Sequence, residues 1–288
     1  MTAHSETYAV PHGGPPPDPP EFPDGADPAP RWPVWFAPAG FLGGFAITLV
    51  VSVIAGIIAA AAGTDIGDEM PPELLLALTV LQGLILCGTA VFLASRIQRP
   101  KAWHFGLRRA RFWRSVGWAT VGLLAFFAFA ILYSQLVTPD GEQSVTEDLG
   151  ADESTAKMIL AGIVVIVVAP IGEEFFFRGF FYRALRSRLG ILTAAAIDGV
   201  VFGLIHFSGS ETLDLIPVLA FLGFVFCLVY ERTKTLYTVI ALHAFNNAIA
   251  YGAEVDAAWV SLVLGPLMLA GCAIAPRLLH PRSAAARV

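Results

Sequence analysis

The chain has 288 residues, of which 56% are hydrophobic and only 14% are charged, and its formal net charge at pH 7 is −5. Its mean hydropathy is +0.68. These values exclude an ordinary soluble domain and indicate a polytopic membrane protein, because a run of about 20 apolar residues is enough to cross the hydrocarbon core as a helix.

The first 33 residues differ in kind from the rest, since they hold ten of the twenty prolines together with several acidic residues. Such a segment cannot bury enough apolar surface to fold. It also lacks the basic start and short apolar core of a secretory signal peptide. We therefore expect a disordered cytoplasmic tail over residues 1–33, an intramembrane domain over 34–280, and a short cytoplasmic tail over 281–288.

Apolar segments follow one another along the rest of the chain. Their lengths and hydropathy predict eight membrane-spanning helices. The predicted spans are residues 36–62, 74–95, 115–137, 157–180, 191–208, 213–230, 235–251 and 257–276. The expected fold is thus an all-α, polytopic membrane helix bundle of about eight transmembrane helices.

The loops between these spans alternate in charge. Basic residues gather in 96–114, 183–188, 232–234 and 277–287, and acidic residues in 65–73, 140–153, 211–214 and 254–256. Basic loops face the cytoplasm, which places both termini there and leaves only Lys157 as a basic residue on the outer side. We expect a multi-pass protein of the cell membrane, whose basic loop at 96–114 contacts anionic lipid headgroups rather than nucleic acid.

Charged side chains interrupt the fourth predicted span, where residues 173–178 read EEFFFR. Charge inside hydrocarbon is costly and usually functional. Glu174 and Arg178 are four residues apart and can pair along one face of a helix, whereas Glu173 is turned about 100° away and is left free. These three residues are candidates for a catalytic site.

Polar residues also occur in spans five and seven, namely Asp198 and His206, then His243 and Asn247. At about 1.5 Å of rise per residue, both histidines reach a depth similar to that of Glu173, so we expect one shared, water-filled cavity. Asp198 lies at the depth of Arg178 and is expected to pair with it. Phe202 precedes His206 by one helical turn, so its ring can brace the imidazole.

Small residues and proline also shape the expected bundle. Pro170 stands just before the two glutamates and predicts a kink or local opening there. Two GxxxG patterns, at Gly40 with Gly44 and at Gly199 with Gly203, would permit close helix approach. The three cysteines fall within predicted spans and are interpreted as packing residues.

Three motifs stand in order on apolar helices: Glu173-Glu174-x-x-x-Arg178, Phe202-x-x-x-His206, and His243-x-x-x-Asn247. Together they resemble the CPBP family of intramembrane proteases, also called the CaaX protease and bacteriocin-processing or Abi family. The resemblance covers about residues 157–250, the motif core. The N-terminal tail and the first three spans carry no comparable signature.

The resemblance implies hydrolysis of a peptide bond of a membrane-associated protein or peptide. In eukaryotic members the reaction removes the last three residues of prenylated CaaX proteins. By motif, Glu173 and His206 would activate a water molecule, and His243 and Asn247 would stabilise the oxyanion. Glu174 and Arg178 belong to the same motif and complete the candidate catalytic set.

Alternatives remain open at this point. No cofactor is required by the favoured, glutamate-dependent mechanism, but a zinc-dependent one would use Glu173, His206 and His243 as metal ligands. The helix-borne HExxH signature of zinc proteases is missing, and a nearby arginine disfavours a dication. A non-catalytic membrane scaffold or immunity protein, or a proton-coupled transporter, would also keep such residues inside a bundle.

Overall fold

The computed structural model describes residues 31–64, 70–137, 145–207, 209–255 and 258–279, and within these ranges the regular structure is entirely helical. The long elements are α1 (Phe36–Ala61), α2 (Pro72–Ser95), α3 (Phe112–Ser134), α9 (Ile216–Thr233), α10 (Leu236–Glu254) and α11 (Trp259–Leu279). Between α3 and α9 lie α4 (Val145–Asp148), α5 (Thr155–Ile163), α6 (Ala169–Phe176), α7 (Tyr182–Arg186) and α8 (Ile191–Leu204). The all-α fold predicted from the sequence is confirmed. Of the predicted tails at 1–33 and 281–288, residues 1–30 and 281–288 lie outside the described residues.

Six helical stretches among the described residues are long and apolar enough to cross a membrane. They are α1, α2, α3, the continuous stretch Thr155–Arg186, the stretch Thr212–Thr233 and α11. The other two predicted spans correspond to α8, which is apolar but only 14 residues long, and to α10, whose hydropathy is lowered by the histidine and asparagines that it carries. The protein is therefore a multi-pass membrane protein.

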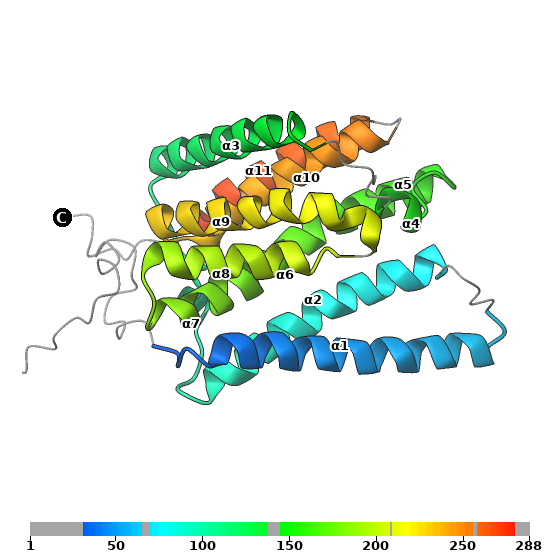
Figure 1. Ribbon diagram of the computed structural model, residues 1–288, viewed down its shortest axis with the longest axis horizontal. Coiled ribbons are helices and arrows are strands. Elements are labelled where there is room, and N and C mark those ends of the chain that lie inside the picture. The colour runs from blue at the N-terminus through cyan, green and yellow to red at the C-terminus, as the bar shows by residue number, and fades with distance from the viewer. Residues whose placement is uncertain (1–30, 65–69, 138–144, 208, 256–257, 280–288) are drawn as a thin grey trace, which may run out of the picture.

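The helices form a bundle with a two-helix layer on one side (Figure 1). There α1 packs against α2, while α8 packs against α9 and α10 against α11. Helix α9 also contacts α3 and α10, and α10 contacts α6. Of the helices that carry the sequence motifs, α6 and α10 thus contact each other, while α8 is held by α9, which also contacts α10.

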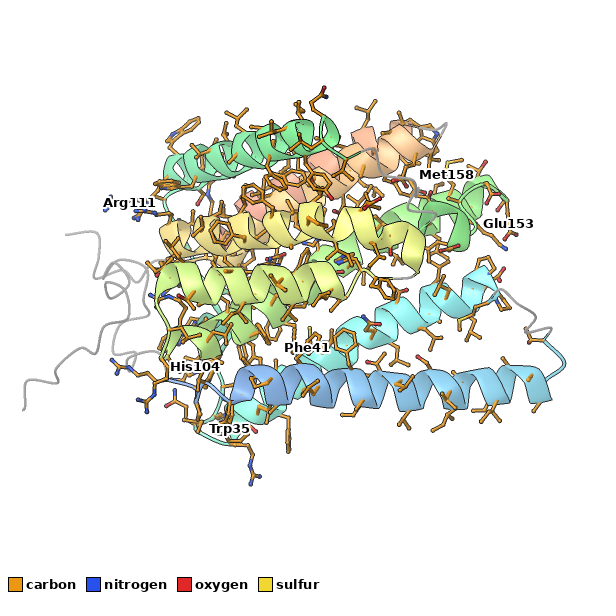
Figure 2. The ribbon with its side chains drawn as sticks, in the orientation of Figure 1. Trp35, Phe41, His104, Arg111, Glu153 and Met158 are labelled. Atoms are coloured by element: carbon orange, nitrogen blue, oxygen red, sulfur yellow. The ribbon has the colours of Figure 1, made fainter. Side chains whose placement is uncertain are left out.

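The two ends of the bundle differ in charge, as the alternating loops predicted. Arg111 and Glu153 lie at opposite ends (Figure 2). At the basic end the loop before α3 is tied to the turn between α9 and α10, since the Thr235 hydroxyl donates to the Arg108 carbonyl at 2.7 Å. The backbone N–H of Leu236 also donates to the Gly106 carbonyl at 2.8 Å.

At the acidic end stands Lys157, the one basic residue that the charge pattern assigns to that side. Its ammonium group pairs with Glu73 at 2.7 Å and with Glu153 at 2.6 Å. The single exception to the charge alternation is therefore neutralised by two of the acidic residues around it.

Trp32, placed at the end of the predicted tail, is only 1% exposed. Its ring packs against Phe105 and Phe180 at centroid distances of 5.1 and 5.3 Å, and the Arg183 guanidinium lies 5.2 Å from the ring. Packing against the bundle thus begins ahead of residue 33, because an indole can bury far more apolar area than the prolines and acids that precede it.

The glycine pattern at Gly199 and Gly203 marks the tightest helix pair. A Cβ atom on Gly199 would lie 2.5 Å from the Ala220 carbonyl oxygen, and one on Gly203 would lie 2.8 Å from the Ala220 nitrogen. These neighbours are backbone atoms of α9 and cannot turn aside. The close approach of α8 to α9 therefore depends on the missing side chains.

The substitution Gly199→Ala is expected to destabilise the protein by about 1–3 kcal/mol, because the added methyl group would push α8 off α9. Gly88→Ala is the matched control, since nothing lies within 4 Å of a Cβ placed there. The thermal midpoint of each purified variant measures the difference. Equal midpoints for the two variants would contradict the assigned packing.

Candidate active site

The helix that carries the first motif is continuous from Thr155 to Arg186 but changes its winding twice. A π-helical turn, η3 (Val164–Val168), precedes α6, and a second, η4 (Phe177–Phe181), follows it. Pro170 stands in the first turn of α6, immediately after η3. The local opening expected at this proline is thus a π turn, in which the N–H of Ala169 bonds to the Val164 carbonyl.

The same π register explains the position of Asn247. In that register the next residue, Pro170, would bond to the carbonyl of Val165, but proline has no N–H to donate. The Asn247 side-chain amide donates to the Val165 carbonyl instead, at 2.9 Å. Asn247 therefore joins α10 to the helix of the glutamates at the point where proline has released a backbone acceptor.

Glu174 and Arg178 form a buried ion pair, as their spacing predicted. The Arg178 Nη1 donates to Glu174 Oε1 at 2.8 Å, and both side chains are 0% exposed. Three aromatic rings surround the guanidinium, with centroid distances of 4.6, 5.1 and 5.7 Å. They belong to Phe202, Phe226 and Phe177, respectively. A desolvated cation gains substantially from such ring faces.

Arg178 is also tied to α8 and α9. Its Nε lies 3.5 Å from Asp198 Oδ1, which confirms the predicted pairing, and its Nη2 donates to the Gly223 carbonyl at 2.8 Å. The Cys227 thiol donates to the same Asp198 oxygen at 3.1 Å. Cys227 is therefore a polar partner and not only the packing residue that sequence analysis assumed. Neither Gly223 nor Cys227 carries a signal in the sequence that would have revealed these contacts.

His243 lies between the two glutamates. Its Nδ1 is 2.8 Å from Glu174 Oε1, and its Nε2 is 3.8 Å from Glu173 Oε2. Glu173 is 23% exposed, and its Oε2 is buried without a hydrogen-bond partner. As predicted, only one of the two glutamates is neutralised by Arg178, and the other points elsewhere.

His206 stands just past the end of α8, because the helix ends at Leu204 and not at residue 208 as predicted. Its Nδ1 lies 2.8 Å from the Phe202 carbonyl, and its ring centroid is 5.0 Å from that of Phe202. The expected bracing by Phe202 is thus confirmed. The His243 ring lies 5.8 Å from the same phenylalanine, so both imidazoles contact one ring.

Glu173, Glu174, Arg178 and His243 are thus brought together, and Asn247 binds the same helix as the glutamates. His206 is linked to them only through the Phe202 ring, which also contacts His243. The catalytic roles of all six residues remain predictions. Two cavities, one between α3, α10 and α11 and the other between α10 and α11, are not lined by any of them. The shared, water-filled cavity expected at the motifs therefore also remains a prediction.

The zinc alternative can be tested against the arrangement of the donors. Zinc sites in proteins need three or four His, Cys, Asp or Glu ligands within about 2.3 Å of one point. Across the described residues, no group of three such side chains is placed to hold a metal ion. Glu173, His206 and His243 are not part of such a group in this arrangement, and the choice between glutamate-dependent and zinc-dependent hydrolysis stays a prediction.

Comparison with known proteins bears on the same part of the chain. Residues 155–249 match the family described as Type II CAAX prenyl endopeptidase Rce1-like. The chain is also 29% identical over 143 residues to a Bacillus subtilis protein named Putative membrane peptidase YdiL. That alignment covers 46% of this chain and 54% of the relative, so the chain spans about half the length of the curated relative that it matches. No solved structure matches the chain significantly.

The matched region contains all three motifs, from Glu173 to Asn247, and the helices that bring them together. Both comparisons point to membrane peptidases, and the resemblance drawn from the motifs is confirmed. The motif core of the chain is thus similar to the CPBP, or CaaX protease, family.

Proposed function

We propose that the protein is an intramembrane endopeptidase that hydrolyses a peptide bond of a membrane-associated protein or peptide without a metal ion. The observation that carries the proposal is the free oxygen of Glu173, a buried carboxylate atom without a hydrogen-bond partner that faces an imidazole nitrogen. Buried acceptors are normally satisfied, and a water molecule bound here would satisfy this one. The family match supports the same reaction class.

Glu173 is the general base of this mechanism. It takes a proton from the bound water as the water oxygen attacks the carbonyl carbon of the substrate, and it later gives that proton to the departing amine. Glu174 is not suited to this part, because its side chain is 0% exposed and its Oε1 is occupied by both Arg178 and His243. The Glu173 side chain is 23% exposed. The two adjacent glutamates therefore have different tasks, one chemical and the other structural.

His243 is oriented by Glu174 to act as an oxyanion donor. An ionised carboxylate only accepts hydrogen bonds, so the proton in the 2.8 Å contact sits on His243 Nδ1. Donation from Nε2 then requires a doubly protonated imidazolium ring.

Asn247 supports the oxyanion from the same face of α10, one helical turn after His243. Its amide has two N–H groups, and one of them is used to hold the Val165 carbonyl. The other is the donor that the mechanism assigns to the tetrahedral intermediate. The bond to Val165 fixes the amide plane, so the donor is oriented before substrate binds.

His206 is assigned to orient the attacking water together with Glu173. Its Nδ1 contact with the Phe202 carbonyl makes Nδ1–H the donor, which leaves Nε2 as an acceptor for the water. Phe202 limits the movement of both imidazoles, because each ring contacts it. A water held between an acceptor imidazole and a free carboxylate oxygen has its lone pair directed away from both of them.

The membrane orientation follows from the charged ends of the bundle. We propose that the basic end, which carries Arg111, faces the cytoplasm of the cell membrane, and that both termini lie on that side. The acidic end with Glu153 then faces outward (Figure 2).

Glu173→Gln is expected to lower cleavage by about 10²–10⁴-fold with the fold intact, because glutamine cannot accept the proton of the attacking water. Glu153→Gln is the control, an acid at the far end of the bundle. Comparative peptidomics of cells carrying each form measures the effect. If wild type, Glu173→Gln and Glu153→Gln all gave the same peptide products, Glu173 would not be the base. If Glu173→Gln instead abolished the flux of a solute, the protein would be a transporter.

Removal of metal ions is expected to leave cleavage unchanged, since the described donors form no metal-binding group. The purified protein would be treated with a strong chelator and then assayed with and without added zinc. Activity that disappears on chelation and returns with zinc would contradict the metal-free mechanism.

The orientation predicts that a cysteine at Asp152 is labelled by a membrane-impermeant maleimide on intact cells, whereas a cysteine at Arg99 is labelled only after lysis. Both positions are exposed and lie at opposite ends of the bundle. Labelling of the Arg99→Cys variant on intact cells would reverse the assigned topology.

A further inference from the structure

A large cleft lies on the side of α10 that faces away from the candidate active site. It has a volume of about 750 Å³ and is lined by residues of α3, α10 and α11 and of the loop before α3. This volume is within the range of sites for small organic ligands, about 300–1,000 Å³. The cleft therefore has room for a ligand that the proposed reaction does not use.

The lining of the cleft changes in character along its length. Three basic residues line one end, namely Arg109 and Arg111 from the loop before α3, and Arg277 from the last turn of α11. The walls farther along are apolar and include Val116, Leu123, Phe245 and Leu269. No acidic side chain lines this cleft among the residues that the structure describes.

The basic end lies at the basic end of the bundle, where Arg111 is seen at the start of α3 (Figure 2). The Arg277 guanidinium is 5.6 Å from the centre of the Phe112 ring, so the charge of α11 is brought to the wall formed by α3. At 1.5 Å per residue, Leu123 lies about 16 Å farther along α3 than Phe112. The cleft thus extends from the membrane surface well into the hydrocarbon.

Helix α10 separates this cleft from the motifs. Ala241 and Phe245 are four residues apart, line the cleft and share a face of α10. His243 stands between them in sequence and is turned about 200° from Phe245, toward Glu174. None of the six candidate catalytic residues lines the cleft, which argues against the scissile segment of a substrate as its occupant.

We propose that this cleft is a binding site for an anionic phospholipid, with an acyl chain along the apolar walls and the phosphate at the arginines. Charge complementarity selects this occupant, because a basic mouth over an apolar groove matches a negative headgroup attached to a hydrocarbon chain. The walls α3 and α11 are also lipid-facing, since Leu124 is 64% exposed and Leu267 is 61% exposed. Phospholipid of the surrounding bilayer is therefore adjacent to the walls of the cleft and available to enter it.

The test uses the full chain purified in detergent and titrated with phosphatidylglycerol or with phosphatidylcholine of the same acyl chains. Native mass spectrometry counts the lipid bound to each protein molecule. One phosphatidylglycerol is expected to remain bound in preference to phosphatidylcholine. The double variant Arg111→Gln/Arg277→Gln is expected to weaken its binding by about fivefold per arginine. Arg99→Gln/Arg188→Gln removes two exposed arginines outside the cleft and should leave binding unchanged.

A second pair of variants tests the apolar walls without changing any charge. Ala273→Phe on α11 fills the cleft and is expected to abolish the selective lipid, whereas Ile274→Phe lies outside the lining and should retain it. The proposal would be overturned if the Ala273→Phe variant retained as much phosphatidylglycerol as wild type. It would also be overturned if the two double arginine variants lost phosphatidylglycerol equally. A cleft-filled variant that keeps the lipid but no longer cleaves peptide would show that the cleft serves the substrate instead. None of these lipid counts depends on peptidase activity, so they remain informative even if the proposed function fails.

Discussion

The buried charge of Arg178 is the constraint around which the centre of this bundle is organised. A guanidinium without water is tolerated only where its charge is offset and its donors are satisfied. Here Glu174 comes from its own helix, Asp198 from α8 and the Gly223 carbonyl from α9. Three aromatic rings complete the enclosure. One cation therefore fixes the mutual positions of three helices. Packing through leucine side chains alone would not fix the rotation of each helix about its own axis.

This arrangement also separates the chemistry of the two glutamates. Because Glu174 is committed to Arg178, it also holds His243 in one orientation and leaves Glu173 as the more exposed carboxylate. Adjacent residues on a helix differ by about 100° in direction, so a single Glu-Glu pair can supply one structural group and one group for the proposed chemistry. The two glutamates can differ in role without a separate loop that supplies the proposed base. The difference requires only that Arg178 lie one turn after Glu174 on the same helix.

Contacts within one helix, or set by helix depth, could be predicted from the sequence, whereas contacts that depend on the rotation of a second helix could not. The Glu174–Arg178 pair and the bracing of His206 by Phe202 follow from four-residue spacing, and the Asp198 contact from depth. The bond from His243 to Glu174 depends on how α10 is turned about its axis, which hydropathy does not specify. The bond from Asn247 to Val165 depends on a π turn, and only the proline that favours it is visible in the sequence. The end of α8 at Leu204 was missed because Ile205 and Phe207 continue the apolar character of the segment although the helix has stopped.

Helix α10 lies between the candidate active site and the proposed phospholipid cleft, and it presents different side chains to each of them. One face carries His243 and Asn247, whose bonds to Glu174 and to the Val165 carbonyl hold the helix against α6. The other face carries Ala241 and Phe245 and forms part of the cleft assigned to a phospholipid. A ligand that fills this cleft packs against the back of the helix that bears the proposed oxyanion donors. Since such donors act only when held within a fraction of an ångström of the developing charge, packing behind the helix would matter to the proposed site as much as the hydrogen bonds in front of it.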